Sequence, residues 1–386
     1  MSRVAVIGAS GFLGTAVIER LAPRMLVMPI IRGSVRAARL ARLGIGMRRV
    51  YARDFGALCE TLEGCTDVVN CTMSNATGLV ESTRTVVAAC QKLQVRRLVH
   101  ISSVAVYGEP PSPLSATEDG PELAARGTYG WAKLCQDRIV LKAARGGLPC
   151  TILCPPLISG CYSYQVLNLL RQLRLGRVPL VDGGSSICNF VDVENLAYAV
   201  ELAVTDRDAH AQRLFITDDS HFTWRDLIES LRALAPQANV SQISRDEAAA
   251  YLQRNRAPSR SMKQTLKHIV SPHVRTVLRE DPLLASLESR ISRVKRTLSR
   301  RSRMPDLDAA RCPQNALPAD WDVATLQRQS RDVVHSCAGA KELLGYRPLR
   351  DTRESMQQFV DWYRATFGWT DPLGDLCREL DLACVE

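Results

Sequence analysis

The stretch that decides the fold is "RVAVIGASGFLG", residues 3–14. A short apolar run ends in a glycine, and Gly8, Gly11 and Gly14 then recur every third residue at the start of a helical pattern. Glycines at this spacing let the backbone turn tightly and approach a pyrophosphate, while the free N–H groups of the helix attract phosphate. We therefore predict a strand, a dinucleotide-binding turn and a helix at the start of the chain.

The same alternation continues through the first half of the chain. Apolar runs at 26–33, 47–55, 65–73, 96–108 and 148–156 are separated by helical patterns. Alternating strands and helices are typical of a parallel sheet covered by helices on both faces. We expect Pro29 to weaken the second strand, because proline cannot donate to a ladder. The sequence thus predicts an α/β fold, with a doubly wound Rossmann domain over residues 1–156.

The rest of the chain, residues 157–386, has a looser rhythm. We expect it to form mainly a smaller α/β substrate-binding region that returns in part to the first domain. Thr223 and Asp226 have the spacing of a helix cap. Residues from about 240 to 320 are polar, basic and punctuated by prolines, which predicts a basic helical insertion.

Much of the net charge of +10 comes from this insertion. Within 283–303, an apolar stripe of helical spacing faces away from seven basic residues. One interpretation is peripheral contact with an anionic membrane. The other is an insertion whose stripe packs on the substrate region or on a partner subunit. Nucleic acid is disfavoured, because no aromatic residues interleave for base stacking.

Composition excludes several classes of protein. The chain has 13 cysteines, an odd number, and no C-x-x-C pair, so we expect reduced thiols and neither a disulfide framework nor a zinc or other metal site. No apolar run approaches the length of a membrane span, and the start lacks a signal-peptide layout. These features favour a cytoplasmic protein, with the inner face of a membrane as a further location.

A second informative stretch is "GTYGWAKLCQDR", residues 127–138. On a helix, Tyr129 and Lys133 lie on the same face, one turn apart. A free phenol, with a pKa of about 10, is a poor base at neutral pH, and a neighbouring ammonium favours the phenolate. The pair could therefore serve acid–base chemistry. Taken alone, a lysine stem packed on a tyrosine ring explains it as well.

Five stretches, taken together, resemble the extended short-chain dehydrogenase/reductases, the NAD-dependent epimerase/dehydratase family. They are "GASGFLG" (8–14), "RRLVHISSVAVYGEP" (96–110), "YGWAK" (129–133), "NFVDVENLAYAVELA" (189–203) and "AKELLGYRP" (340–348). The resemblance implies an oxidoreductase or epimerase with Ser103, Tyr129 and Lys133 as catalytic residues. It makes Tyr129 the acid/base at a secondary alcohol or ketone. Lys133 would lower the pKa of Tyr129 and hold the nicotinamide ribose, and Ser103 would hydrogen-bond the reacting oxygen.

The resemblance also implies a set of cofactor-binding residues. They are Gly8, Ser10, Gly11, Phe12, Gly14, Arg32, Asp54, Phe55, Thr72, Tyr129, Lys133 and Pro156. The second strand ends in Arg32 rather than in the acid that NAD enzymes use for the ribose 2′-OH, and an arginine can pair with a 2′-phosphate. This favours NADP(H) and leaves NAD(H) open.

Departures from the family pattern bear on the small-molecule substrate. Sugar-nucleotide members carry arginines where this chain has Cys154 and Cys188, and Arg171, Arg174 or Arg177 could substitute. Sugar 4,6-dehydratases place an Asp-Glu pair where this chain has Val104 and Ala105, which disfavours a dehydratase.

Three alternatives for the function follow. A nucleotide-sugar 4-epimerase or 4-ketoreductase leads, followed by a reductase or dehydrogenase of an apolar, sterol-like or lipid substrate. A cofactor-binding scaffold without activity is third. We expect a homodimer.

Overall fold

The computed structural model describes residues 2–206, 208, 211–255, 321–331 and 333–367. The basic segment 283–303, for which membrane contact and internal packing were the two interpretations, lies outside these residues, as does most of the predicted insertion. One compact unit comprises residues 1–248 and 321–386, and a second comprises 249–320. The description below concerns the first unit. None of the described helices is both long and apolar enough to cross a membrane.

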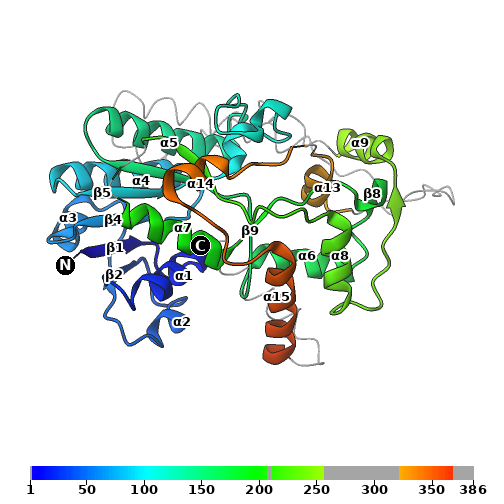
Figure 1. Cartoon of the computed structure of the whole chain (residues 1–386), viewed down its shortest axis with the longest axis horizontal. Coiled ribbons are helices and arrows are strands. Elements are labelled where there is room, and N and C mark those ends of the chain that lie inside the picture. The colour runs from blue at the N-terminus through cyan, green and yellow to red at the C-terminus, as the bar shows by residue number, and fades with distance from the viewer. Residues whose placement is uncertain (1, 207, 209–210, 256–320, 332, 368–386) are drawn as a thin grey trace, which may run out of the picture. The chain divides into compact units, whose positions relative to one another are not determined.

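A seven-stranded parallel sheet forms the centre of this unit (Figure 1). Its order is β10-β6-β5-β4-β1-β2-β3. The strands are β1 (Arg3–Ile7), β2 (Leu26–Ile31), β3 (Arg48–Arg49), β4 (Asp67–Asn70), β5 (Arg97–Ile101), β6 (Cys150–Cys154) and β10 (Arg213–Phe215). The chain runs outward from β1 to β3 and then returns to β4 on the other side of β1. This doubly wound order confirms the predicted fold class.

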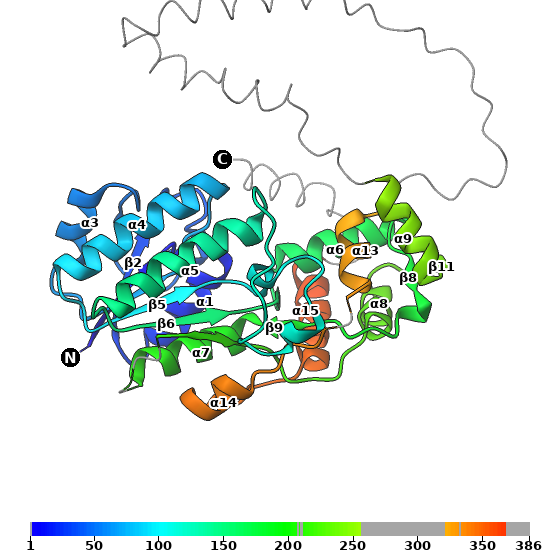
Figure 2. The ribbon, with the colours of Figure 1, turned by 90° about the horizontal axis from the view of Figure 1, so that it is seen from above.

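Helices cover both faces of the sheet (Figure 2). One face carries α1 (Phe12–Leu21), α2 (Ala38–Ala41), α7 (Val193–Thr205) and α14 (Ala338–Leu344). The other carries α3 (Phe55–Leu62), α4 (Ala76–Lys92) and α5 (Tyr129–Arg145). Alternate residues of one strand therefore enter two different cores: Val4 and Val6 contribute to the first, Ala5 and Ile7 to the second.

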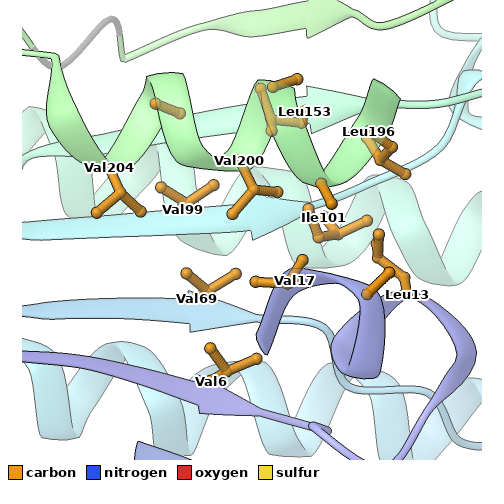
Figure 3. Close-up of a cluster of buried hydrophobic side chains, with 14 of the residues drawn as sticks. Val6, Leu13, Val17, Val69, Val99, Ile101, Leu153, Leu196, Val200 and Val204 are labelled. Atoms are coloured by element: carbon orange, nitrogen blue, oxygen red, sulfur yellow. The ribbon is translucent and has the colours of Figure 1, made fainter. Parts of the chain in front are cut away.

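Figure 3 shows how valines hold α1 and α7 against the first face. Val6, Val69 and Val99 come from three neighbouring strands and are fully buried. Val17 of α1 and Val200 of α7 pack against them. β-Branched side chains suit the pleated surface of a sheet, so the sequence preference of these strands and their packing agree.

The reason for expecting Pro29 to weaken β2 was wrong, because β2 pairs with β1 from Leu26 to Ile30, across the proline. The Ile30 carbonyl accepts from Gly8 N on the β1 side (3.0 Å), and the Ile31 carbonyl accepts from Val50 N on the β3 side (2.9 Å). Peptide groups alternate along a strand, so the nitrogen of Pro29 faces the β3 side. Because β3 pairs only with Ile30 and Ile31, no ladder bond is lost there.

A second region has its own core, built from a third cluster of buried side chains. Its helices are α6 (Tyr164–Arg174), α8 (Trp224–Arg232) and α15 (Thr352–Phe367). Two short pairs accompany them: β7 (Leu157–Ser159) with β9 (Phe190–Asp192), and β8 (Leu180–Val181) with β11 (Gln242–Ile243). The predicted cap at Thr223 and Asp226 is present as a reciprocal capping box. Two further α-helices lie in the described part of the chain, α9 (Arg245–Arg254) and α13 (Val323–Gln329).

The close packing of the turn between β1 and α1 leads to a prediction about the free energy of unfolding. A Cβ added at Gly14 would lie 2.2 Å from the carbonyl oxygen of Gly8, which is backbone and cannot rotate away. We expect Gly14→Ala to destabilise the fold by about 1–3 kcal/mol or more, measured by thermal or urea unfolding. Gly33→Ala is the matched control, because a Cβ there meets nothing within 4 Å. Equal stability of the two variants would contradict the close approach.

Candidate active site

Ser103 lies at the carboxyl edge of the sheet, two residues after β5. Its hydroxyl accepts a hydrogen bond from Ala105 N (3.2 Å) and so caps the short 3₁₀ helix η1 (Val104–Tyr107). The next amide, Val104 N, donates to the carbonyl of Pro155 after β6 (3.1 Å). Two adjacent strand ends therefore fix the position of Ser103.

Tyr129 is the first residue of α5. Thr128 caps the helix by accepting from Trp131 N (3.2 Å). Gly130 lets α5 come close to η1, because a Cβ there would lie 2.2 Å from the carbonyl oxygen of Ala105. This close packing brings Tyr129 near Ser103, whose side chain acts on the Tyr129 hydroxyl and lowers its pKa.

Lys133 follows one turn later and is only 3% exposed. Its Nζ donates to the Ile101 carbonyl at the end of β5 (3.0 Å) and lies 5.9 Å from the centre of the Tyr129 ring. Burial lowers the pKa of Lys133 to about 8. The structure thus brings together the three side chains that were predicted to be catalytic.

The electrostatics of Tyr129 differ from the expectation. Although the residue is 43% exposed, the surroundings of its hydroxyl raise the pKa of Tyr129 above its ordinary value. The largest influence in the lowering direction is the Ser103 side chain, not the charge of Lys133. Tyr129 is therefore protonated at neutral pH, the form that can donate a proton to a carbonyl oxygen.

The glycine turn lies beside the end of β4. A Cβ at Gly8 would be 2.7 Å from the carbonyl oxygen of Cys71 and 3.2 Å from Thr72 N. The charge of Lys133 acts on the Cys71 thiol, so the turn lies within electrostatic reach of this predicted catalytic residue. Only a residue without a side chain fits at Gly8, whose φ of +84° also favours glycine. This backbone cradle, with the start of α1 beside it, fits the phosphates of a dinucleotide.

The other predicted cofactor residues lie along the same edge. Ser10, Gly11 and Phe12 form the turn and the first residue of α1, and Pro156 follows β6. Arg32 is exposed directly after β2. Asp54 caps α3 by accepting from Ala57 N (3.1 Å), and Phe55 is 41% exposed with Lys92 Nζ 5.4 Å from its ring centre.

Two arginines that the sequence analysis missed lie near Cys188. Arg328 and Arg331 follow the long stretch outside the described residues, and both act electrostatically on the Cys188 thiol. Arg331 pairs with Glu109 (2.7 Å), an acid that also acts on Tyr129. Arg328 makes no ion pair with any acid in the described part of the chain, and burial lowers its pKa. A guanidinium in such a place favours an anionic partner.

Hydrogen bonds hold these arginines in place. Gln329 donates to the carbonyl of Pro179 (2.7 Å) and accepts from Val181 N (3.0 Å). Asn189 donates to the Val333 carbonyl (2.8 Å). Residue spacing in the sequence could not predict these contacts, because the hydrogen-bonded residues lie 144–150 positions apart in the chain. Of the substitutes suggested from the sequence, Arg174 donates to Leu234 O (2.8 Å) and lies over the Tyr363 ring.

Known proteins with similar sequences include two reductases and, over 63 residues at 38% identity, the dTDP-glucose 4,6-dehydratase of Streptomyces antibioticus, a match that covers 15% of this chain and 19% of that protein. The 4-hydroxy-2-methyl-3-oxo-4-farnesyl-3,4-dihydroquinoline-1-oxide ketoreductase of Stigmatella aurantiaca is 26% identical over 242 residues, covering 59% of this chain and 72% of that protein. The 2-alkyl-3-oxoalkanoate reductase of Shewanella oneidensis is 27% identical over 271 residues, covering 63% of this chain and 68% of that protein.

A solved structure shares the fold at low sequence identity. The UDP-glucose 4-epimerase of Thermus thermophilus, in complex with NAD, has a TM-score of 0.61 and 16% identity, covering 94% of this chain and 99% of that one. The family model of the NAD dependent epimerase/dehydratase family matches residues 4–216, more than half of the chain. That span runs from the first strand through β10 and includes the glycine turn, Ser103, Tyr129 and Lys133. The chain therefore belongs to the NAD dependent epimerase/dehydratase family.

Proposed function

We propose that the protein is a nicotinamide-dependent oxidoreductase that interconverts a ketone and a secondary alcohol, working mainly as a ketoreductase. The observation that carries this proposal is the placement of Tyr129 between Ser103 and Lys133 at the carboxyl edge of the sheet. The bound cofactor would supply the hydride. The residues of this chain would then bind the reacting oxygen and deliver its proton.

Each of the three side chains has a distinct part in this proposal. Ser103 hydrogen-bonds the carbonyl oxygen and orients it. Tyr129, protonated at neutral pH, gives its proton to that oxygen as negative charge develops there. Lys133 contributes positive charge beside Tyr129 and hydrogen-bonds the ribose of the cofactor. Reduction uses the protonated phenol and oxidation the phenolate, so the raised pKa of Tyr129 supports reduction near neutral pH.

Elimination chemistry has less support. Val104 and Ala105 follow Ser103 in η1, and neither side chain can take or give a proton. We therefore propose that the protein is not a dehydratase.

The substrate in this proposal carries an anionic group. The support is Arg328, held beside Cys188 without an acidic partner among the described residues. The leading candidate is a nucleotide sugar, whose diphosphate Arg328 and Arg331 would bind. A ketone with a carboxylate on an alkyl chain is the second, favoured by the name of the Shewanella oneidensis relative. A panel of both classes, with each cofactor and with product analysis, distinguishes reduction from epimerisation.

The proton donor can be tested directly. We expect Tyr129→Phe to lose nearly all turnover, because phenylalanine has no proton to give, while cofactor affinity stays within about twofold. Cofactor binding is measured by fluorescence titration and turnover by the nicotinamide absorbance. A variant that retains the full rate would show that another group donates the proton.

Arg32 tests the proposed preference for NADP(H). A charge-assisted hydrogen bond to a 2′-phosphate corresponds to about 10- to 100-fold in affinity. We expect Arg32→Ala to weaken NADPH binding by that factor and NADH binding far less. An equal loss for both cofactors would mean that Arg32 does not contact the 2′-phosphate.

Substitution of Arg328 tests whether the substrate carries an anionic group. With the substrate identified by the panel, Arg328→Gln should raise KM about 10- to 100-fold and leave kcat within a few-fold. Arg347→Gln, at an exposed position on the turn after α14, is the matched control. An unchanged KM would remove Arg328 from the substrate site.

A further inference from the structure

Asp137 is a fully buried acid that the proposed chemistry does not use. It lies one helical turn after Lys133 in α5, on the same side of the helix. Its Oδ2 accepts from Arg213 Nε (2.6 Å), and its Oδ1 lies 3.8 Å from His100 Nε2. A buried carboxylate is costly to maintain, so its place beside a catalytic lysine calls for an explanation.

Arg213, whose Nε lies 2.6 Å from Asp137 Oδ2, favours the charged form of Asp137. Burial raises the pKa of Asp137, and Arg213 is the strongest influence against that rise. Arg213 is the first residue of β10, and its Nη2 also contacts Glu122 Oε1 (2.7 Å), which in turn pairs with Arg138 (2.9 Å). A chain of alternating charges thus runs from the surface to Asp137.

Asp137 is the strongest acidic influence on Lys133, acting from one helical turn away and not through an ion pair. Burial lowers the pKa of Lys133, and Asp137 is the largest influence in the raising direction, followed by Cys71 and Cys154. Burial raises the pKa of both thiols, so they are neutral near pH 7. Two further groups face the lysine.

These two groups are neutral as well. Burial and the charge of Lys133 hold the pKa of His100 well below its ordinary value. Burial raises the pKa of Tyr129, which is protonated. Of the groups on β4, β5, β6 and α5 that face Lys133, Asp137, which is paired with Arg213 at 2.6 Å, is therefore the one placed to carry a formal negative charge.

We propose that Asp137 is a positioning residue whose carboxylate, held by Arg213, keeps the Lys133 side chain as an ammonium ion at neutral pH. The proposal deepens the proposed function and rests on it for its catalytic meaning. The geometry supports it: the acid and the lysine are buried on one side of α5, the arginine side chain that pairs with the acid is 9% exposed, and Lys133 Nζ is anchored at 3.0 Å to a neutral carbonyl. A carbonyl alone leaves the ammonium charge uncompensated.

The direct test is the titration of Lys133, which needs no substrate. The chain has seven lysines, so protein labelled with ¹³C at lysine Cε gives few NMR signals, and Lys133→Arg assigns the relevant one. We expect a midpoint near pH 8 in the native protein. In Asp137→Asn the midpoint should fall by about one pH unit or more, because the compensating charge is gone. Asp137→Glu should restore it.

Two further variants complete the design. Asp246→Asn removes a carboxylate on the exposed surface of α9 and should leave the midpoint unchanged. Asp137→Asn alone leaves Arg213 with a single acidic partner and could impair folding. The double variant Asp137→Asn/Arg213→Gln removes both charges and should show the same lowered midpoint. An unchanged midpoint in either folded variant would overturn the proposal, leaving Asp137 as a tie between α5 and β10.

Activity separates this proposal from the proposed function. In ketone reduction, the alkaline limb of the kcat/KM profile of Asp137→Asn should move to lower pH together with the NMR midpoint. A purely structural role would lower the melting temperature and leave that limb in place. If the midpoint falls but the native protein reduces no ketone of the panel, the role of Asp137 stands and the proposed function fails.

Discussion

The hydrogen bond from Lys133 Nζ to the Ile101 carbonyl is the constraint on which the site depends. A buried ammonium must be paired with polar groups, and here the partner is the last residue of β5. The bond ties α5 to the sheet at the point where the chain turns toward Ser103. The register of α5 then places Tyr129 beside Ser103, and the lack of a side chain at Gly130 allows the close approach. The positions of Tyr129 and Lys133 relative to Ser103 thus follow from one buried contact and one missing Cβ.

Sequence patterns predicted the fold well where the signal was local. The glycine turn, the parallel strands and the cap at Thr223 each depend on residues within a few positions of one another, and the structure confirms them. The prediction for Pro29 failed because it considered the proline without its neighbours: the unpaired side of β2 at that point is visible only in the sheet order. The effect of a residue on a strand therefore depends on which neighbouring strand its backbone faces.

The site was predictable only in part, for the same reason. Ser103, Tyr129 and Lys133 were found by family resemblance, and a helix period explains why two of them share a face. Arg328 and the pair of Asp137 with Arg213 were not found, because their contacts join segments 76 to about 140 residues apart. The sequence analysis also predicted the wrong direction for the pKa shift of Tyr129. Proximity of a lysine suggested a lowered pKa for Tyr129, whereas burial of the hydroxyl outweighs that effect and raises it.

The raised pKa of Tyr129 gives the site a direction. A phenol that stays protonated suits reduction of a carbonyl, and a charged Lys133 beside it stabilises the oxygen anion that forms when the proton leaves. The ion pair of Asp137 with Arg213 supports the same conclusion, because it favours the ammonium form of Lys133. Both features support a net ketoreductase more than an enzyme that must oxidise and reduce in each cycle.

The central claim is that hydride reaches a carbonyl carbon while Tyr129 protonates the oxygen. The most direct measurement follows a ketone of the panel with cofactor deuterated at the transferable position of the nicotinamide ring. The account predicts one deuterium on the carbon that bears the new hydroxyl group, at a rate that collapses in Tyr129→Phe. Product that forms without deuterium at that carbon, or at an unchanged rate in the variant, would contradict it.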